Sequence, residues 1–257
     1  MKAILLGGAA LSLLTVSAFG ADLGPEVPLK MPPMPPPFTW TSCYAGVQAG
    51  GGFGQTGLTD SALILAPFTG FTSANVSMSG YTLGGEIGCD YQFPSNFVLG
   101  IEGGAAGGNI GGSTTFAVPA VAPGDIATFK EATDILSSVT GRVGYAWDRW
   151  LIYAKGGGAW AGNRYGAFDT LATYDYEALE TRFGWTAGVG VEWALWDAWS
   201  LKLEYDYYGF GTRSVTFIDN VTGNVGPENI NQTIQVIKLG LNFHVFPGAA
   251  PVIPLGW

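Results

Sequence analysis

Two carboxylates in the stretch LKLEYDYYGF, residues 201–210, have a spacing that general acid–base chemistry can use. Glu204 and Asp206 stand two residues apart, and in a β-strand this spacing places both side chains on one face, beside Lys202. The opposite face consists of Leu201, Leu203, Tyr205 and Tyr207. Because acids and a base share one face while the other is apolar, we interpret them as parts of a structural charge network and not as catalytic residues.

His244 is the one histidine of the sequence, and it falls near the end of a strand-like segment, residues 233–246. A histidine that activates a nucleophile needs that nucleophile beside it, and a metal site needs several ligands. A single histidine with no cysteine on its face provides neither arrangement. We therefore expect no catalytic residues, no metal and no cofactor, and we interpret His244 as an interfacial residue.

Cys43 and Cys89 are the only cysteines of the sequence, and they leave two alternatives open. Both lie on the apolar faces of neighbouring strand-like segments, near the same end. A cross-strand disulfide forms if the register of the two segments places the cysteines opposite each other. Export to an oxidising compartment permits this bond. Two free thiols are the other alternative.

The first residues indicate export. Lys2 is followed by an apolar run over residues 3–16 and by the small-x-small sequence AFG at 18–20, so residues 1–20 are predicted to be a signal peptide. Residues 21–38 are proline-rich and are expected to form an extended periplasmic lead. No later run of about 18 apolar residues exists, so any part that spans a membrane must be a β-barrel.

The composition favours a membrane environment and argues against a nucleic-acid partner. Charged residues make up 12% of the 257 residues, compared with roughly 25% in soluble domains. The formal net charge is −9, and the 11 lysines and arginines are spread over the whole chain. Because nucleic-acid binding requires a concentrated basic patch, we expect no nucleic-acid partner.

Eight segments have a strand-like pattern. They cover about 42–53, 78–93, 97–108, 132–147, 150–162, 182–196, 199–210 and 233–246. Only residues 94–96, 148–149 and 197–198 separate alternate pairs of segments, whereas roughly twenty residues separate the others. This pattern predicts an all-β fold, an eight-stranded antiparallel up-and-down transmembrane β-barrel over residues 39–246, with short periplasmic turns and long extracellular loops. Residues 247–257 are then a C-terminal tail.

Aromatic residues gather beside every short turn, as in the interfacial girdle of a membrane barrel. The turn-end set consists of Tyr91, Phe93, Phe97, Tyr145, Trp147, Trp150, Trp193, Trp196, Trp199, Phe243 and Phe246. A looser second belt toward the other end consists of Phe53, Tyr81, Trp160, Trp185 and Tyr207.

Ten charged residues share the face opposite to the apolar one. They are Glu86, Asp90, Glu102, Arg142, Lys155, Glu192, Lys202, Glu204, Asp206 and Lys238. A lysine or arginine on the lipid side at the bilayer midplane costs about 2–4 kcal/mol, so we expect these side chains to point into the lumen. The lumen of an eight-stranded barrel is just wide enough for side chains. Acids and bases should therefore form a paired network that plugs it, with room left by Gly84, Gly88, Gly188 and Gly190.

Four stretches resemble small alphaproteobacterial outer-membrane immunogenic, porin-like barrel proteins. They are the predicted mature start ADL, FTWTSCYAGVQAGGGFG (38–54), TGRVGYAWDRWLIYAKGGGAW (140–160) and IKLGLNFHVF (237–246). The resemblance implies an integral outer-membrane β-barrel exposed at the cell surface, with no fixed enzymatic role. Ser42-Cys43 stands where Gly-Phe is usual, and the chain continues past Phe246. Phe246 and Trp257 are thus both candidates for the terminal aromatic residue that the barrel assembly machinery reads.

These observations predict a structural, surface-exposed protein of the cell outer membrane with a largely plugged lumen. The expected partners are outer-membrane lipid and lipopolysaccharide, the barrel assembly machinery, and surface ligands met through acidic loops. The competing interpretations are a small diffusion pore for solutes, an outer-membrane enzyme that depends on Glu204, and a soluble ligand-binding barrel.

Overall fold

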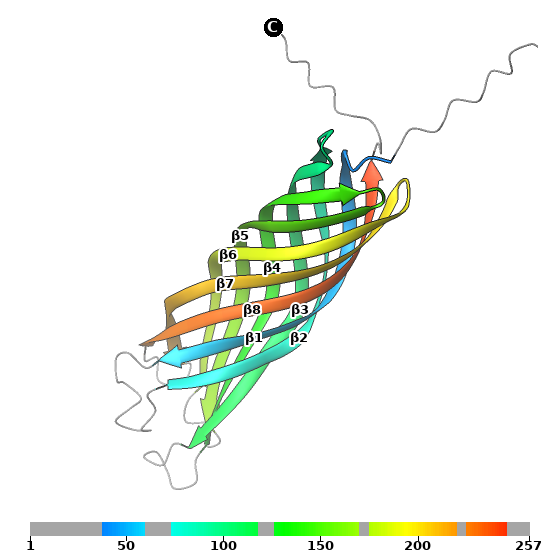
Figure 1. The fold of residues 1–257 in the computed structure, drawn as a ribbon. Coiled ribbons are helices and arrows are strands. Elements are labelled where there is room, and N and C mark those ends of the chain that lie inside the picture. Colours follow the sequence, from blue (N-terminus) through cyan, green and yellow to red (C-terminus); the bar gives the residue numbers. More distant parts are fainter. Residues whose placement is uncertain (1–37, 60–72, 118–125, 170–174, 220–224, 246–257) are drawn as a thin grey trace, which may run out of the picture. The chain divides into compact units, whose positions relative to one another are not determined.

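The computed structural model describes residues 38–59, 73–117, 126–169, 175–219 and 225–245, and these form a closed β-barrel (Figure 1). Its strands are β1 (Ser42–Thr59), β2 (Ser73–Gln92), β3 (Phe97–Ala117), β4 (Ile126–Trp147), β5 (Trp150–Asp169), β6 (Asp175–Trp196), β7 (Trp199–Asp219) and β8 (Val225–Val245). The described part contains no helix long and apolar enough to cross a membrane. The predicted fold class is confirmed.

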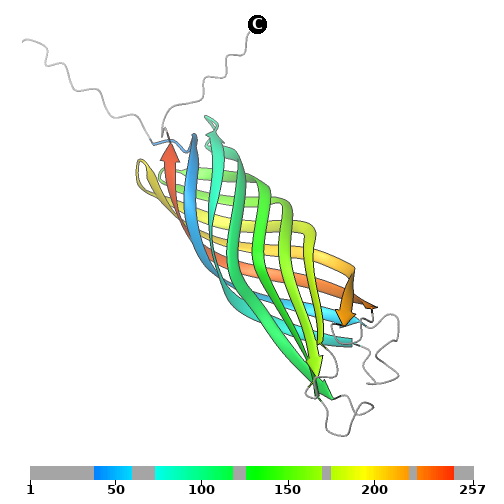
Figure 2. The ribbon, with the colours of Figure 1, turned by 180° about the vertical axis from the view of Figure 1, so that it is seen from behind.

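Each strand pairs antiparallel with its sequence neighbours, and β1 pairs with β8 to close the sheet. Figures 1 and 2 show the strands inclined together around the wall. The short turns lie at one end, where Asn96 and Asp148 have φ values of 65° and 53°. Asparagine and aspartate tolerate this left-handed region better than other non-glycine residues, which suits them to tight turns.

The strands extend further at the loop end than the sequence pattern predicts. β1 continues to Thr59 instead of ending near residue 53, and β8 begins at Val225 instead of near residue 233. Beyond the membrane a strand needs no continuous apolar face. The extensions contain Ser, Thr, Asn and Gly, so they show no clear alternation of apolar and polar residues. Their backbone pairing nevertheless continues. The predicted signal peptide, the predicted proline-rich lead up to residue 37, Phe246, Trp257 and the predicted tail lie outside the described residues.

The two faces of the wall have opposite chemistry. Lys202 and Glu192 are fully buried, whereas Leu203 is 48% and Val189 is 57% exposed. Their strands therefore turn charged side chains inward and aliphatic side chains outward. A soluble barrel would have the reverse arrangement, because apolar surface avoids water.

The exposed aromatic residues form two belts at different levels. All described members of the turn-end set are exposed, and so are Phe53, Tyr81, Trp160 and Trp185 of the second belt, whereas Tyr207 is half-buried. On β5 the belts are marked by Trp150 and Trp160, ten residues apart. At about 3.3 Å per residue and a tilt of about 40°, this separation corresponds to roughly 25 Å of height, the height of the apolar band in outer-membrane barrels.

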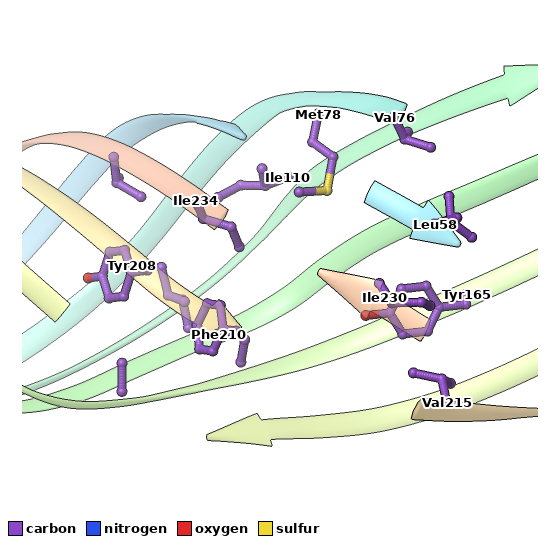
Figure 3. Packing of buried hydrophobic residues seen from close by; sticks show 14 of the residues in the cluster. Leu58, Val76, Met78, Ile110, Tyr165, Tyr208, Phe210, Val215, Ile230 and Ile234 are labelled. Atoms are coloured by element: carbon purple, nitrogen blue, oxygen red, sulfur yellow. The ribbon is translucent and has the colours of Figure 1, made fainter. Parts of the chain in front are cut away.

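The lumen is layered, and β5 passes through every layer. Its inward residues are Leu151, Tyr153, Lys155, Ala159, Ala161, Asn163 and Tyr165, all buried. Leu151 and Tyr153 belong to an apolar cluster at the turn end. Lys155 belongs to a charged layer. Ala159, Ala161 and Tyr165 belong to a second apolar cluster toward the loop end, which includes Met78, Ile110 and Ile234 (Figure 3).

By strand alternation, the apolar residues Ile234 and Val236 of β8 fall on the opposite face from Ile237 and Leu239, although the strand contains no bulge there. The register between β1 and β8 is continuous there, and Ile234 and Val236 point inward because the lumen is apolar at this level. The irregularity lies on β7, where the pairing shifts between Gly209 and Gly211. Phe210 is the extra residue there and packs inside, with Gly211 at a φ of 65°.

Because the outer face is apolar and the lumen is charged, the structure predicts how much stability is lost when a charge is placed on the outer face. Val189 lies midway between Trp185 and Trp193 on β6, so Val189→Lys should lower the free energy of unfolding by about 2–4 kcal/mol. Thr181→Lys, on the same face but beyond the loop-end belt, should cost less than about 1 kcal/mol. Urea unfolding in lipid vesicles measures both, and equal losses would contradict the membrane placement.

Candidate functional site

The ten charged residues expected on one face all point into the lumen, and none is more than 6% exposed. Six are carboxylates and four are lysines or arginines. They come from seven of the eight strands, β2 to β8. β1 adds the hydroxyl of Tyr44, which donates to Glu102 Oε2 at 2.8 Å. The layer therefore joins side chains from the whole circumference of the wall.

The charged layer has two parts, and Arg142 is the centre of the part nearest the short turns. Its Nε donates to Asp90 Oδ1 at 2.7 Å, and its Nη2 forms a second contact with the same carboxylate. Its Nη1 lies 3.3 Å from Glu192 Oε2. The guanidinium carbon lies 4.8 Å from the ring centre of Tyr44 and 4.9 Å from that of Tyr153, so two aromatic rings also contact this cation.

Glycines make room for these rings. A Cβ atom at Gly88 would lie 2.3 Å from the Tyr44 hydroxyl, and one at Gly190 would lie 2.4 Å from the Tyr153 ring. Both glycines are on the face where the sequence predicts space for long side chains. The side chains that fill the space beside these glycines are Tyr44 and Tyr153, the two tyrosines that flank Arg142.

Three lysines, Lys155, Lys202 and Lys238, occupy the part of the charged layer nearer the loop end. Glu204 lies within 3.3 Å of all of them, with Oε1 at 2.5 Å from Lys155 Nζ and 2.7 Å from Lys238 Nζ. Lys238 Nζ also lies 2.5 Å from Asp206 Oδ2. Thus Glu204 and Asp206, whose spacing suggested acid–base chemistry, are both occupied by lysine partners.

Glu102 connects the two parts. Its Oε1 accepts from Lys155 Nζ at 2.9 Å, and its Oε2 lies 3.3 Å from Lys202 Nζ and 3.6 Å from Arg142 Nη1. Lys202 Nζ in turn lies 2.5 Å from Glu86 Oε2. Buried charges are costly unless they are paired and hydrogen-bonded, so the members of this layer depend on one another.

His244 lies inside the lumen at the turn end, which corrects the expectation of an interfacial position. The residue is 4% exposed. Its Nδ1 and Nε2 lie 2.8 Å from the Ser42 and Ser200 hydroxyl oxygens. Ser200 also donates to Glu192 Oε1. In a Ser-His-acid triad one ring nitrogen contacts the serine and the other contacts the acid. Here Nε2 contacts Ser200, but Nδ1 contacts Ser42 instead of an acid, and Ser200 is fully buried. The arrangement therefore differs from that of a triad.

Trp40 covers this end of the lumen, a role that the sequence reasoning missed. It precedes β1 and is fully buried in the turn-end cluster. Its backbone N–H donates to Gln92 Oε1 at 2.8 Å, and its ring centre lies 5.2 Å from that of Phe38 and 5.9 Å from that of His244. The available signal was a tryptophan just before the first strand, within the stretch that carries the family resemblance.

A second polar layer toward the loop end was also missed. Gln232 Nε2 donates to Glu131 Oε1 at 2.9 Å, and Asn163 Nδ2 donates to Gln232 Oε1 at 2.8 Å. Arg182, which is fully buried, donates to Ile230 O and to Glu180. Three of these residues, Glu131, Asn163 and Gln232, stand just outside the predicted strand ends, which is why their faces were not assigned.

Cys43 and Cys89 form a disulfide between directly paired residues of β1 and β2. Both side chains are exposed on the outer face. The register between the two strands, which the sequence left open, decides between the two alternatives.

Comparisons with known proteins agree with this architecture. A family model described as an outer membrane protein beta-barrel domain matches residues 39–243. The chain is 29% identical over 259 residues to the 31 kDa outer-membrane immunogenic proteins of Brucella melitensis biotype 1 and Brucella suis biovar 1, covering 95% of this chain and 99% of each relative.

Among solved structures, the outer membrane protease OmpT from Escherichia coli is similar with a TM-score of 0.48 and 9% identity. The likeness covers 82% of this chain and 99% of that one. Similarity at this level does not bear on what this chain does.

The contacts of Arg142 predict a large loss of stability when its charge is removed. Arg142→Met leaves Asp90 and Glu192 buried without their main cation, so the free energy of unfolding should fall by about 3–5 kcal/mol. Arg149→Met removes an exposed arginine that pairs with Asp197, and should cost less than about 1 kcal/mol. Urea unfolding of the two variants compares them, and similar losses would contradict the network.

The burial of Trp40 predicts that its ring stabilises the closed turn end. Trp40→Ala should lower the free energy of unfolding by about 3–5 kcal/mol, because it empties a fully buried site. Trp147→Ala removes a ring that is 77% exposed at the same end and should cost clearly less. The midpoint of the heat-modifiability transition on a gel ranks the variants. The reverse order would show that Trp40 is not part of the packed structure.

Proposed function

Because the chain belongs to the outer membrane protein beta-barrel family and resides in the cell outer membrane, we propose that it acts there as a structural, surface-exposed barrel with a closed lumen. The role is non-catalytic. The protein contributes a rigid wall to the envelope and presents its loop end to the outside.

The charged layer is the observation that carries this proposal. Side chains from all eight strands meet in it, and Glu102 alone contacts partners on β1, β4, β5 and β7. A solute or ion that passed through would have to break several buried ion pairs at once. Such a rearrangement is costly, because each separated charge would be left without a partner in a low-dielectric interior.

The layers on either side of the charges support closure. Trp40 and the turn-end cluster lie on one side, and the cluster with Ile110 and Phe210 lies on the other. A cavity of about 10 Å³ between Gln48, Glu102, Tyr208 and Lys238 has room for about one water molecule.

The names of the relatives support exposure at the cell surface. The Brucella proteins are called immunogenic outer-membrane proteins, and an immunogenic barrel presents its loops to the host. Surface ligands that bind the loop end fit this role.

A small diffusion pore is the competing function, and conductance distinguishes the two. Folded protein, verified by its heat-modifiable gel mobility, is inserted into planar bilayers beside a known porin as the positive control. We expect no steady conductance from the wild type, because the charged layer blocks ion flow. Reproducible steps that scale with the amount of folded protein would overturn the closed lumen and favour the pore.

A further inference from the structure

Outward-facing basic side chains occur at one level of the wall. Among the strand residues whose side chains the structure describes, Lys130 and Arg164 are basic and exposed on the outer face. Both lie beyond the loop-end aromatic belt.

Both cations line one groove. Lys130 on β4 and Arg164 on β5 border a hollow of about 700 Å³ on the loop-end part of the wall. Lys130 pairs in register with Gly166, so Arg164 is its diagonal neighbour on the same face, at about 7–8 Å between Cα atoms. Small residues make up much of the rest of the hollow, including Ser79, Gly111, Ser113 and Ala132.

The height of the groove matches the headgroup region of the outer leaflet. Arg164 is four residues beyond Trp160 on β5, which corresponds to about 10 Å above the belt for a strand tilted by about 40°. Lipid headgroups occupy the space just outside the hydrocarbon core. A cation at this level meets headgroup phosphate rather than acyl chains.

We propose that this groove binds a phosphate group of the phosphorylated glycolipid of the outer leaflet. Lys130 and Arg164 donate to the phosphate oxygens, since guanidinium and ammonium groups are the usual donors to phosphate. The small polar residues leave space for the adjoining sugar. The proposal rests on the surface-exposed orientation of the loop end, and it does not depend on whether the lumen is closed.

Asp134 is an acidic group that competes with a phosphate for Arg164, and Glu131, which points into the lumen, also borders the hollow. The Oδ2 of Asp134 accepts from Arg164 Nε at 3.0 Å and from Nη2 at 2.7 Å. The two side chains are 63% and 35% exposed, and exposed ion pairs hold their partners weakly. Removal of the Asp134 carboxylate should therefore strengthen phosphate binding.

The test uses full-length folded protein in detergent micelles, with bisphosphorylated lipid A and its dephosphorylated form as probes. Wild type should bind the phosphorylated form more tightly. The double variant Lys130→Gln/Arg164→Gln should bind it roughly 10- to 30-fold more weakly and should lose the preference. Asp134→Asn should bind it severalfold more tightly. Affinities are measured by fluorescence titration, and the folded state of each variant by heat modifiability.

Arg149→Gln is the matched control, because Arg149 forms an exposed pair with Asp197 at the opposite end of the barrel. Its affinity should equal that of the wild type. An equal loss in this control would show a general charge effect and overturn the site, as would an unchanged preference in the double variant. Displacement of lipid A by low inorganic phosphate would show a free-anion site instead. Conductance by the wild type would overturn the closed lumen alone, because the groove lies on the outer wall.

Discussion

Closure of the sheet between β1 and β8 is the constraint on which the rest of the structure depends. In hydrocarbon every backbone N–H and C=O must find a partner within the protein, and a closed sheet leaves no unpaired edge. With eight strands the enclosed space is only as wide as the side chains that fill it. Each inward side chain must therefore pack against side chains from other strands, and its chemistry must suit theirs.

The charged layer satisfies this condition through mutual dependence. Glu102 and Glu204 each contact three cations, and Arg142 is held by three carboxylates and two tyrosine rings. Removing one member leaves others buried and unpaired, and this mutual dependence supports the proposal of a closed lumen. A barrel of this kind is better suited to a structural role than to conduction.

The two ends of the wall differ in what they contact. At the turn end, Trp40 and His244 are enclosed, and the exposed tryptophans mark the periplasmic interface. At the loop end, the strands continue beyond the second belt, where Lys130 and Arg164 are exposed on the outer face. The same wall thus separates a lumen filled with side chains from an outer surface whose chemistry changes along the barrel.

The sequence by itself determined the strand pattern, the apolar and charged faces and the aromatic belts, because alternation along a strand is a local property. Only the tertiary structure decided which charges pair, since Lys202 and Glu86 are 116 residues apart and Arg142 and Asp90 are 52 apart. It also decided the Cys43–Cys89 bond, the enclosure of Trp40 and the loop-end extent of the strands. These features depend on register and closure, which relate distant segments and leave no periodic signal in any one of them.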